Sequence, residues 1–419
     1  MFKLFLLLLL SSSCSFFISR IDTPIVKDEK LAAQTPAIAG HCSFDKKIEF
    51  QLVGPSGNSQ NVYNEMIKGL NKSSLDFLDH FALWNLLQLS VRPDQSSPTS
   101  RFQVLVHQGE KSYYFDFFSE HNVDQYPFLY GIEWVLKKFG KKRNLEYYAH
   151  ILNQTLPQKI KIGKDFESFL VKNIPLIKNN SELAPYYFRG SDVLKENETS
   201  PNLDYKTVIK LYRKVQKNQK IIVNTSLTHF VTDKGSTGSC NYDFNLYDNS
   251  IFLIDKVIPV ANLYGLSLPN SAFLASSSQK LERMASLEGL PLFKGESKVR
   301  SSAVCMIENN NNKIWAFSNQ SRDPGQHLFH LVRYGLPQSQ TTAEVDKLIR
   351  HSRHLFLSDP VRLIIESDRS SEDQIENLLK LNIPIYNADK LGNIWAYTKF
   401  KEGSRFIIDD RNPGDFKCQ

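Results

Sequence analysis

The sequence predicts an α+β protein, on three observations about the spacing of its apolar residues. Between residues 62 and 152 apolar residues recur at helical spacing, which predicts a mainly helical first part with a small sheet. From residue 220 onward short strand-like runs take over. Residues 299–389 alternate strands with helices, which predicts a mixed sheet flanked by helices. At this length we expect two domains, a mainly helical domain over 41–200 and an α/β domain over 201–419.

The first fifteen residues have the organisation of an export signal. Lys3 gives a positive start, residues 5–10 form an apolar run too short to span a bilayer, and serines precede Cys14. This order resembles the lipobox of bacterial lipoproteins, in which the cysteine is acylated and becomes the new amino terminus. The resemblance implies a signal peptide over 1–14 and fatty acyl chains such as palmitate on Cys14. An ordinary signal peptide that is removed together with Cys14 is the alternative.

The following segment, residues 15–40, holds prolines and charges without a sustained period, which predicts a tether between anchor and fold. Ser15 after the cysteine favours the outer membrane, if the enteric sorting rule for lipoproteins applies. We therefore expect a cell-envelope protein held on the membrane by its lipid, with an envelope protein or a polysaccharide as partner. The net charge of +7 is spread along the chain rather than gathered in a stripe, so nucleic acid is not expected as a partner.

The helical half begins with a short strand and contains one hairpin. Its expected strands are 47–53, 102–107 and 113–118, and its expected helices are 62–70, 75–89, 128–139, 145–152, 166–171 and 204–215. A polar stretch over 179–200 marks the expected domain boundary. The second half then opens with expected strands 221–224, 244–247, 251–254 and 257–261.

The late region 299–389 has the most regular order of elements. Strands are expected over 303–307, 314–318, 362–365 and 383–386, with helices from His327, over 344–351 and over 372–381. This order resembles the cytidine-deaminase-like fold. The resemblance puts His327 at the zinc-ligand histidine, Phe329 where the catalytic glutamate belongs, and Asp368 and Ser371 where the ligand cysteines belong. It implies a relative without zinc chemistry; a generic α/β domain with the same connections is the alternative.

Four cysteines remain after Cys14, namely Cys42, Cys240, Cys305 and Cys418. An even number in an exported chain predicts disulfides, and three pairings exist. We expect Cys42 with Cys418 and Cys240 with Cys305. Because no two cysteines have CxxC spacing, a structural zinc site is not expected.

Four histidines form two pairs at helical spacing, His327 with His330 and His351 with His354. Such pairs are weak candidates for metal ligands, since they would have to converge and gain a carboxylate. Arginines nearby disfavour a cation. We therefore expect neither a metal nor another cofactor.

Two further patterns have a chemical interpretation. The group His229, Asp233, Cys240 and Asp243 contains the residue types of a thiol hydrolase, although sequence proximity does not bring them together. The near-identical pentapeptides 314–318 and 394–398 each carry a tryptophan, which either packs in the core or forms a stacking surface for sugar rings.

No catalytic motif is intact, and we therefore predict a non-enzymatic binding or scaffold protein at the envelope. The alternative is a divergent envelope hydrolase that uses a cysteine nucleophile or a histidine-bound metal.

Overall fold

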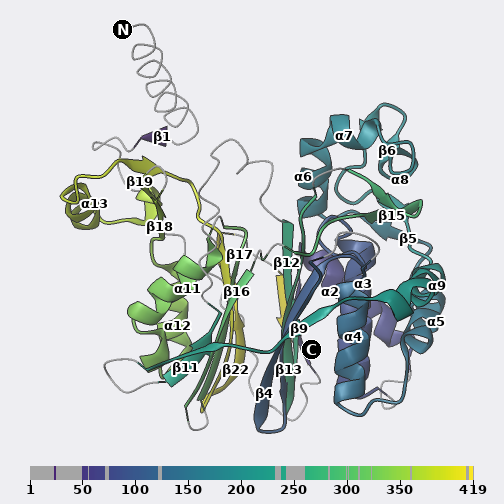
Figure 1. The fold of residues 1–419 in the computed structure, drawn as a ribbon, viewed down its shortest axis with the longest axis horizontal. Coiled ribbons are helices and arrows are strands. Elements are labelled where there is room, and N and C mark those ends of the chain that lie inside the picture. The colour runs from purple at the N-terminus through teal and green to yellow at the C-terminus, as the bar shows by residue number, and fades with distance from the viewer. Residues whose placement is uncertain are drawn as a thin grey trace, which may run out of the picture.

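The computed structural model confirms an α+β fold. It describes residues 23–24, 50–54, 56–70, 75–120, 125–231, 237–241, 260–281, 284–298, 300, 302–309, 312–321, 323–358, 361–411 and 415–418. Two large antiparallel sheets stand face to face in the centre, and helices cover the outer face of each (Figure 1). None of the helices in these ranges is long and apolar enough to cross a bilayer.

The first large sheet has seven strands, in the order β23-β2-β12-β13-β3-β4-β9. Their bounds are β2 Gln51–Gly54, β3 Arg101–Gln108, β4 Lys111–Phe118, β9 Ile222–Asn224, β12 Val260–Leu268, β13 Ser271–Gln279 and β23 Asp415–Cys418. The hairpin expected from strands 102–107 and 113–118 is confirmed as β3 and β4; Gly109 in its turn lies at φ +66°, a conformation that favours glycine.

The second large sheet has six strands, in the order β10-β11-β16-β17-β21-β22. Their bounds are β10 Thr228–Val231, β11 Thr237–Cys240, β16 Ser302–Asn309, β17 Asn312–Asn319, β21 Asn393–Phe400 and β22 Gly403–Ile407. The two tryptophan pentapeptides lie on the neighbouring strands β17 and β21, which pair directly.

Alternation along the strands decides which side chains fill the layer between the sheets. Trp315, Phe317 and Tyr397 of the six-stranded sheet pack there against Leu105 and Leu274 of the seven-stranded sheet. At one end this layer turns polar. Asn241 donates to the Tyr114 hydroxyl (2.9 Å), and Ser276 bonds Ser302 (2.7 Å).

Helices α2 Ser56–Lys68, α3 Phe77–Val91 and α4 Pro127–Lys138 cover the outer face of the seven-stranded sheet, and α5 Leu145–Thr155 and α9 Tyr205–Val215 pack outside them (Figure 1). Helix α3 is buried on all sides, and a capping box between Asp76 and Asp79 fixes its start. Helix α4 approaches the sheet closely because Gly131 has no side chain; a Cβ there would lie 2.7 Å from the rings of Phe102 and Phe117.

The six-stranded sheet is covered by α11 Pro324–Arg333 and α12 Thr342–Arg350. Two smaller parts extend from the body. One holds α6 Lys164–Lys172, α7 Ile174–Lys178 and α8 Ala184–Tyr187 with the short pairs β5 Lys159–Lys161, β8 Thr199–Pro201, β6 Phe188–Arg189, β7 Asp192–Val193, β14 Ser286–Leu287 and β15 Leu290–Phe293. The other holds α13 Glu372–Leu379 and the sheet β1 Thr23–Pro24, β20 Ile385–Asn387, β19 Val361–Ile365 and β18 His354–Ser358.

The expected division near residue 200 does not hold. The seven-stranded sheet takes β2, β3 and β4 from the first half and β12, β13 and β23 from the second, so both halves share one sheet. Strand β23, close to the end of the chain, pairs with β2. The first half is mainly helical, but its strands β2 and β3 pair with strands of the second half.

The element order behind the deaminase-like resemblance is present along the chain but is split between two sheets. Strands β19 and β20 are parallel neighbours, as that fold requires. The hairpin β16–β17 instead belongs to the six-stranded sheet and pairs with β21. The single sheet that the resemblance implies is therefore not formed.

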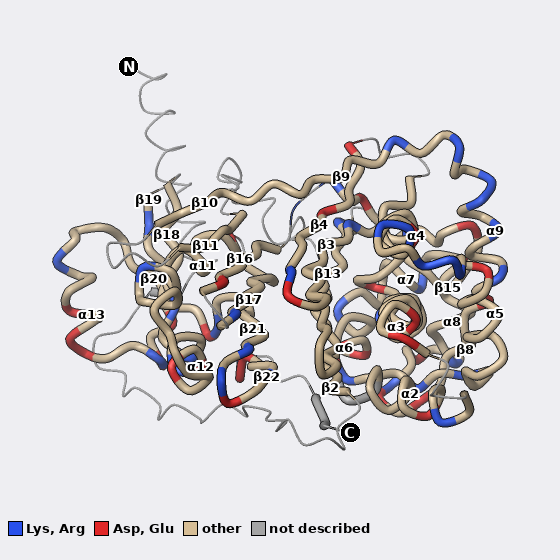
Figure 2. The backbone as a smooth tube through the Cα atoms, turned by 90° about the horizontal axis from the view of Figure 1, so that it is seen from below, with Lys and Arg blue, Asp and Glu red and all other residues tan. Residues whose placement is uncertain are grey.

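Charged residues are interleaved over the outer helices and loops, while the central strands carry few (Figure 2). No stripe of one sign runs along the part of the chain described above.

Candidate active site

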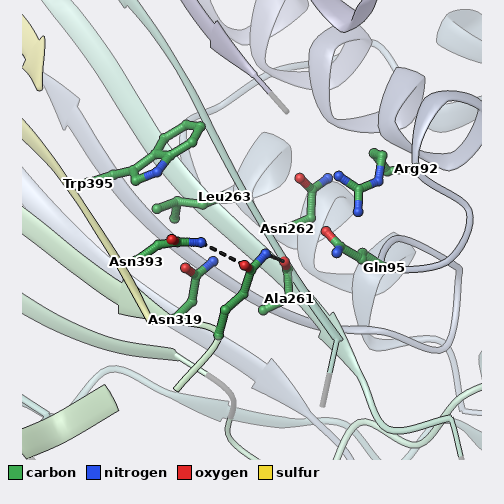
Figure 3. A pocket seen from close by; sticks show the side chains of 9 residues that line it. Arg92, Gln95, Ala261, Asn262, Leu263, Asn319, Asn393 and Trp395 are labelled. Atoms are coloured by element: carbon green, nitrogen blue, oxygen red, sulfur yellow. Dashed lines mark hydrogen bonds between the residues drawn. The ribbon is translucent and has the colours of Figure 1, made fainter. Parts of the chain in front are cut away.

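A polar pocket lies at one rim of the layer between the two sheets. It is a narrow pocket with room for about one water molecule, and part of it is open to solvent. Arg92, Gln95 and Asn262 lie on one side, and Asn319, Asn393 and Trp395 lie on the other (Figure 3). Ala261, Leu263 and Gln320 complete the lining. Five of these nine side chains are carboxamides, so the pocket offers donors and acceptors with little net charge.

Gln320 joins the two sheets at this rim. Its Nε2 donates to the Ala261 carbonyl of β12 (3.2 Å), and its Oε1 accepts from Asn393 Nδ2 of β21 (2.7 Å; Figure 3). Gln320 holds φ at +54°, which is uncommon for a residue with a side chain. Strained backbone of this kind concentrates at functional sites, so the position is a candidate on geometry alone.

Ser321 follows directly and bonds a buried histidine. The distance from Ser321 Oγ to His327 Nε2 is 2.7 Å, and the Asp323 backbone N–H also donates to Ser321 Oγ (3.3 Å). Asp323 caps α11, which carries His327 in its first turns. A hydroxyl within hydrogen-bond reach of an imidazole is the arrangement of a nucleophile and its base.

Gly392 makes room for this pair. A Cβ on Gly392 would lie 2.8 Å from the Asn319 carbonyl oxygen, 2.8 Å from Ser321 Cβ and 3.5 Å from His327 Cδ2. Its φ of +64° also favours glycine. The turn before β21 can therefore pass directly over Ser321.

His327 is neutral in the folded protein. Burial, followed by the positive charge of Arg353, lowers its pKa well below the ordinary value of a histidine. We assign the proton to Nδ1, because Nε2 is then free to accept the Ser321 hydroxyl proton. Nδ1 has no hydrogen-bond partner within the described ranges. The base is thus held by packing rather than by a carboxylate.

Arg353 holds the backbone turn before β21 by hydrogen bonds. It donates to the carbonyls of Leu391 (3.1 Å) and Gly392 (3.0 Å) and pairs with the buried Asp409. Asp409 also accepts from the Ile394 backbone N–H (2.8 Å). Burial alone would raise the pKa of Asp409, but Arg353 and Arg411 hold it below its usual range.

The proposed thiol site is not formed. Cys240 is disulfide-bonded to Cys305, as expected, and Asp233 and Asp243 lie outside the described residues. Strand alternation also separates the candidates, because His229 lies opposite Ser239 while Cys240 lies opposite Thr228. His229 Nδ1 instead contacts Ser239 Oγ (2.7 Å). Cys42 lies outside the described ranges, so its pairing with Cys418 stays a prediction.

The four clustered histidines partly converge. His330 of α11 stacks on His354 of β18 (4.0 Å between ring centroids), whereas His351 faces Tyr334 (5.2 Å) and His327 bonds Ser321. Over the described ranges no group of three or more His, Cys, Asp and Glu could hold a metal ion.

The two tryptophans have different positions. Trp315 is fully buried against Tyr397 (5.1 Å between centroids), whereas Trp395 lines the rim pocket. Sequence reasoning selected His327 and Trp395 but missed Ser321 and Gln320. One local signal was present, since Asp323 followed by Pro324 marks a helix start two residues after Ser321.

Comparison with solved structures finds the same fold over almost the whole chain. A threonine-to-alanine variant of LmbA2991 has a TM-score of 0.62 at 8% identity, covering 92% of this chain and 99% of that chain. A second LmbA2991 structure has a TM-score of 0.61 at 7% identity with the same coverage. Cephalosporin acylase from Bacillus halodurans has a TM-score of 0.56 at 6% identity, covering 94% of this chain and 99% of that chain. This chain is similar in fold to an acylase.

At such identities the similarity shows the fold alone. No family model matches the sequence, and no curated protein matches it.

Proposed function

We propose that this protein hydrolyses amide bonds at the rim pocket, with Ser321 as nucleophile and His327 as base. The observation that carries the proposal is the 2.7 Å contact between Ser321 Oγ and the neutral His327, directly after a residue that lines the pocket. The similarity in fold to an acylase along almost the whole chain supports the same reaction class. This favours the hydrolase alternative, with a serine hydroxyl in place of the thiol or the metal.

The reaction follows the usual course of acyl transfer. His327 Nε2 takes the hydroxyl proton as Ser321 Oγ attacks the amide carbonyl. The C–N bond breaks, the amine leaves with the proton from His327, and the acyl group stays on Oγ. Water, deprotonated by His327, then releases the carboxylic acid and restores Ser321. Gln320 and Asn393 each donate one side-chain N–H in the contacts above and have a second N–H for the developing oxyanion.

A binding function without catalysis is the second candidate. The observation in its favour is that burial makes His327 a weak base and that no described carboxylate orients its Nδ1.

We also propose that the protein works outside the cytoplasm, anchored through Cys14 at the envelope. The Cys240–Cys305 disulfide supports a compartment in which disulfides form.

The test measures amine release from a panel of N-acyl aminocoumarin amides and from a cephalosporin. We expect Ser321→Ala to lower kcat/KM by about 10³-fold or more, with the fold retained in circular dichroism. Ser239→Ala is the matched control, since Ser239 also bonds a histidine at 2.7 Å but lies away from the pocket. A fluorophosphonate probe should label Ser321 in the wild-type protein. Equal activity of Ser321→Ala and wild type would refute the assignment.

Intact-mass measurement tests another route to the same activity. In N-terminal nucleophile hydrolases the chain is cut before a Ser or Thr, whose free amino group then serves as base. Thr225, Ser226 and Thr228 are exposed where the chain crosses between the two large sheets. Cleavage there, with the label on the new terminus, would retain the hydrolase and refute Ser321 as nucleophile.

A further inference from the structure

Residues 391–394, which lead into β21, are held by four buried charged side chains. These are Arg353, Glu366, Asp409 and Arg411, here called the ionic clamp, and each of them is at most 7% exposed. The clamp pairs two guanidinium groups with two carboxylates through direct ion pairs. Charged side chains buried to this degree are rare unless they are paired, as they are here.

The clamp bonds the backbone of the turn at both ends. The Leu391 N–H donates to Glu366 Oε1 (2.7 Å), and the Ile394 N–H donates to Asp409 Oδ2 (2.8 Å). Arg353 donates to two carbonyls that lie between these amides in the chain. Four peptide groups of a four-residue segment are therefore bonded to side chains of the clamp.

Arg411 joins the two carboxylates to each other. Its Nε donates to Glu366 Oε1 (2.6 Å), and its Nη1 donates to Asp409 Oδ1 (3.2 Å). The same guanidinium donates to the carbonyls of Ile349 (3.2 Å) and His351 (2.9 Å), where α12 ends. The turn is thus fixed relative to α12 and to the strands β19 and β22, which end shortly before the two carboxylates.

Net stability does not explain why these four residues are charged. Moving paired charges out of water is unfavourable, and apolar residues of the same volume are often equally stabilising. Apolar side chains could not, however, bond the peptide groups of the turn. Carboxylates and guanidinium groups do so in defined directions, so the clamp fixes the path of the backbone.

The path of this turn decides where the candidate nucleophile and base lie. A Cβ on Gly392 would lie 2.8 Å from Ser321 Cβ and 3.5 Å from His327 Cδ2, so the turn packs directly on both residues. His327 Nδ1 has no hydrogen-bond partner within the described ranges. Packing against the turn therefore takes the place of the carboxylate that orients the base in a Ser-His-Asp triad.

We propose that Glu366 and Asp409 are positioning residues of the hydrolase, which keep Ser321 and His327 at bonding distance by fixing the turn at Gly392. They act through the backbone and take no part in proton transfer. This inference rests on the proposed function and deepens it. Because a displacement of about 1 Å at a reacting group can cost about 10²-fold in rate, loss of one clamp contact should lower kcat by about that factor.

The experiment compares Glu366→Gln with a matched control in the full chain. The control is Asp79→Asn, because Asp79 is also fully buried and paired with two cations, Lys141 (2.8 Å) and Arg143 (2.9 Å), but lies on α3. Both variants should lose stability in urea unfolding. Only Glu366→Gln should lower kcat, by about 100-fold, with KM changed by no more than about twofold.

A second measurement does not depend on activity. In the wild-type protein the N–H groups of Leu391 and Ile394 should exchange with solvent as slowly as that of Trp315 in the central strand β17. Glu366→Gln should accelerate the exchange at Leu391. It should also shift the imidazole ¹⁵N signals of His327, which the control variant should leave in place.

Three outcomes overturn the proposal. These are rapid exchange of both turn amides in the wild-type protein, unchanged His327 signals in folded Glu366→Gln, and equal loss of kcat in Glu366→Gln and Asp79→Asn. Absence of amide hydrolysis by the wild-type protein would refute the proposed function, while the exchange and the imidazole signals would still decide whether the clamp positions the turn. The wild-type exchange decides even if Glu366→Gln does not fold.

Discussion

The substitution Gly392→Ala tests whether close approach of the backbone positions Ser321. The new Cβ would meet the Asn319 carbonyl oxygen and Ser321 Cβ, both at 2.8 Å, a separation that real Cβ atoms essentially never show. Two unfavourable contributions follow. The left-handed φ of +64° costs about 1–2 kcal/mol for a residue with a Cβ, and the forced displacement costs about 1–3 kcal/mol. We expect the free energy of unfolding to fall by about 2–5 kcal/mol.

The matched control is Gly140→Ala. Gly140 has a similar φ of +76°, but a Cβ there would meet nothing within 4 Å. Its substitution should therefore cost only the conformational part, about 1–2 kcal/mol. The difference between the two variants isolates the contact at Ser321.

The assay is urea unfolding of both variants beside wild type, with amide hydrolysis measured in parallel. Gly392→Ala should lower kcat/KM because Ser321 moves away from His327, whereas Gly140→Ala should leave it unchanged. Equal losses of stability in the two variants, or full activity of Gly392→Ala, would refute the reasoning.

Three other predictions concern stability. Burial and the neighbouring His354 lower the pKa of His330 to about 4, so the unfolded chain binds a proton between about pH 6.5 and 4 that the folded chain does not. The free energy of unfolding should therefore decrease as the pH is lowered through that window, and His330→Gln should make this decrease smaller. A urea midpoint that depends on pH as steeply in His330→Gln as in the wild type would contradict this. Replacing Cys240 and Cys305 by Ser opens a link across 65 residues and should lower the free energy of unfolding by about 4 kcal/mol, as measured by urea unfolding without reductant; an unchanged midpoint would contradict it. Arg353→Met removes one of the two arginines that pair with the buried Asp409 and should cost about 3–5 kcal/mol, and adding Asp409→Asn should recover part of the loss; no recovery in the double variant would contradict the pairing.

The fold class and many elements follow from local sequence. The long helix α3, the hairpin β3–β4 and the hairpin β16–β17 all form close to where the sequence predicts them. Local periodicity and turn chemistry are sufficient there, because each partner is a near neighbour in the chain.

The candidate site could be predicted only in part. His327 stands out in the sequence as a metal candidate, yet its partner is the hydroxyl of Ser321, six residues earlier. The pairing of Cys240 with Cys305 is confirmed, and this disulfide is also the reason that the thiol site fails. In the register between β10 and β11, Ser239 rather than Cys240 lies opposite His229. A shift of one residue would place Cys240 there instead.

By itself the sequence determined the α+β class, the hairpins and the long helices, because these depend on spacing between residues close in the chain. Tertiary structure alone decided that strands from both halves share one sheet, and that Ala261, Gln320 and Gly392 meet around Ser321. The physical reason is that a sheet is completed by hydrogen bonds between strands of any separation, and the sequence of one strand carries little information about which distant strand will pair with it.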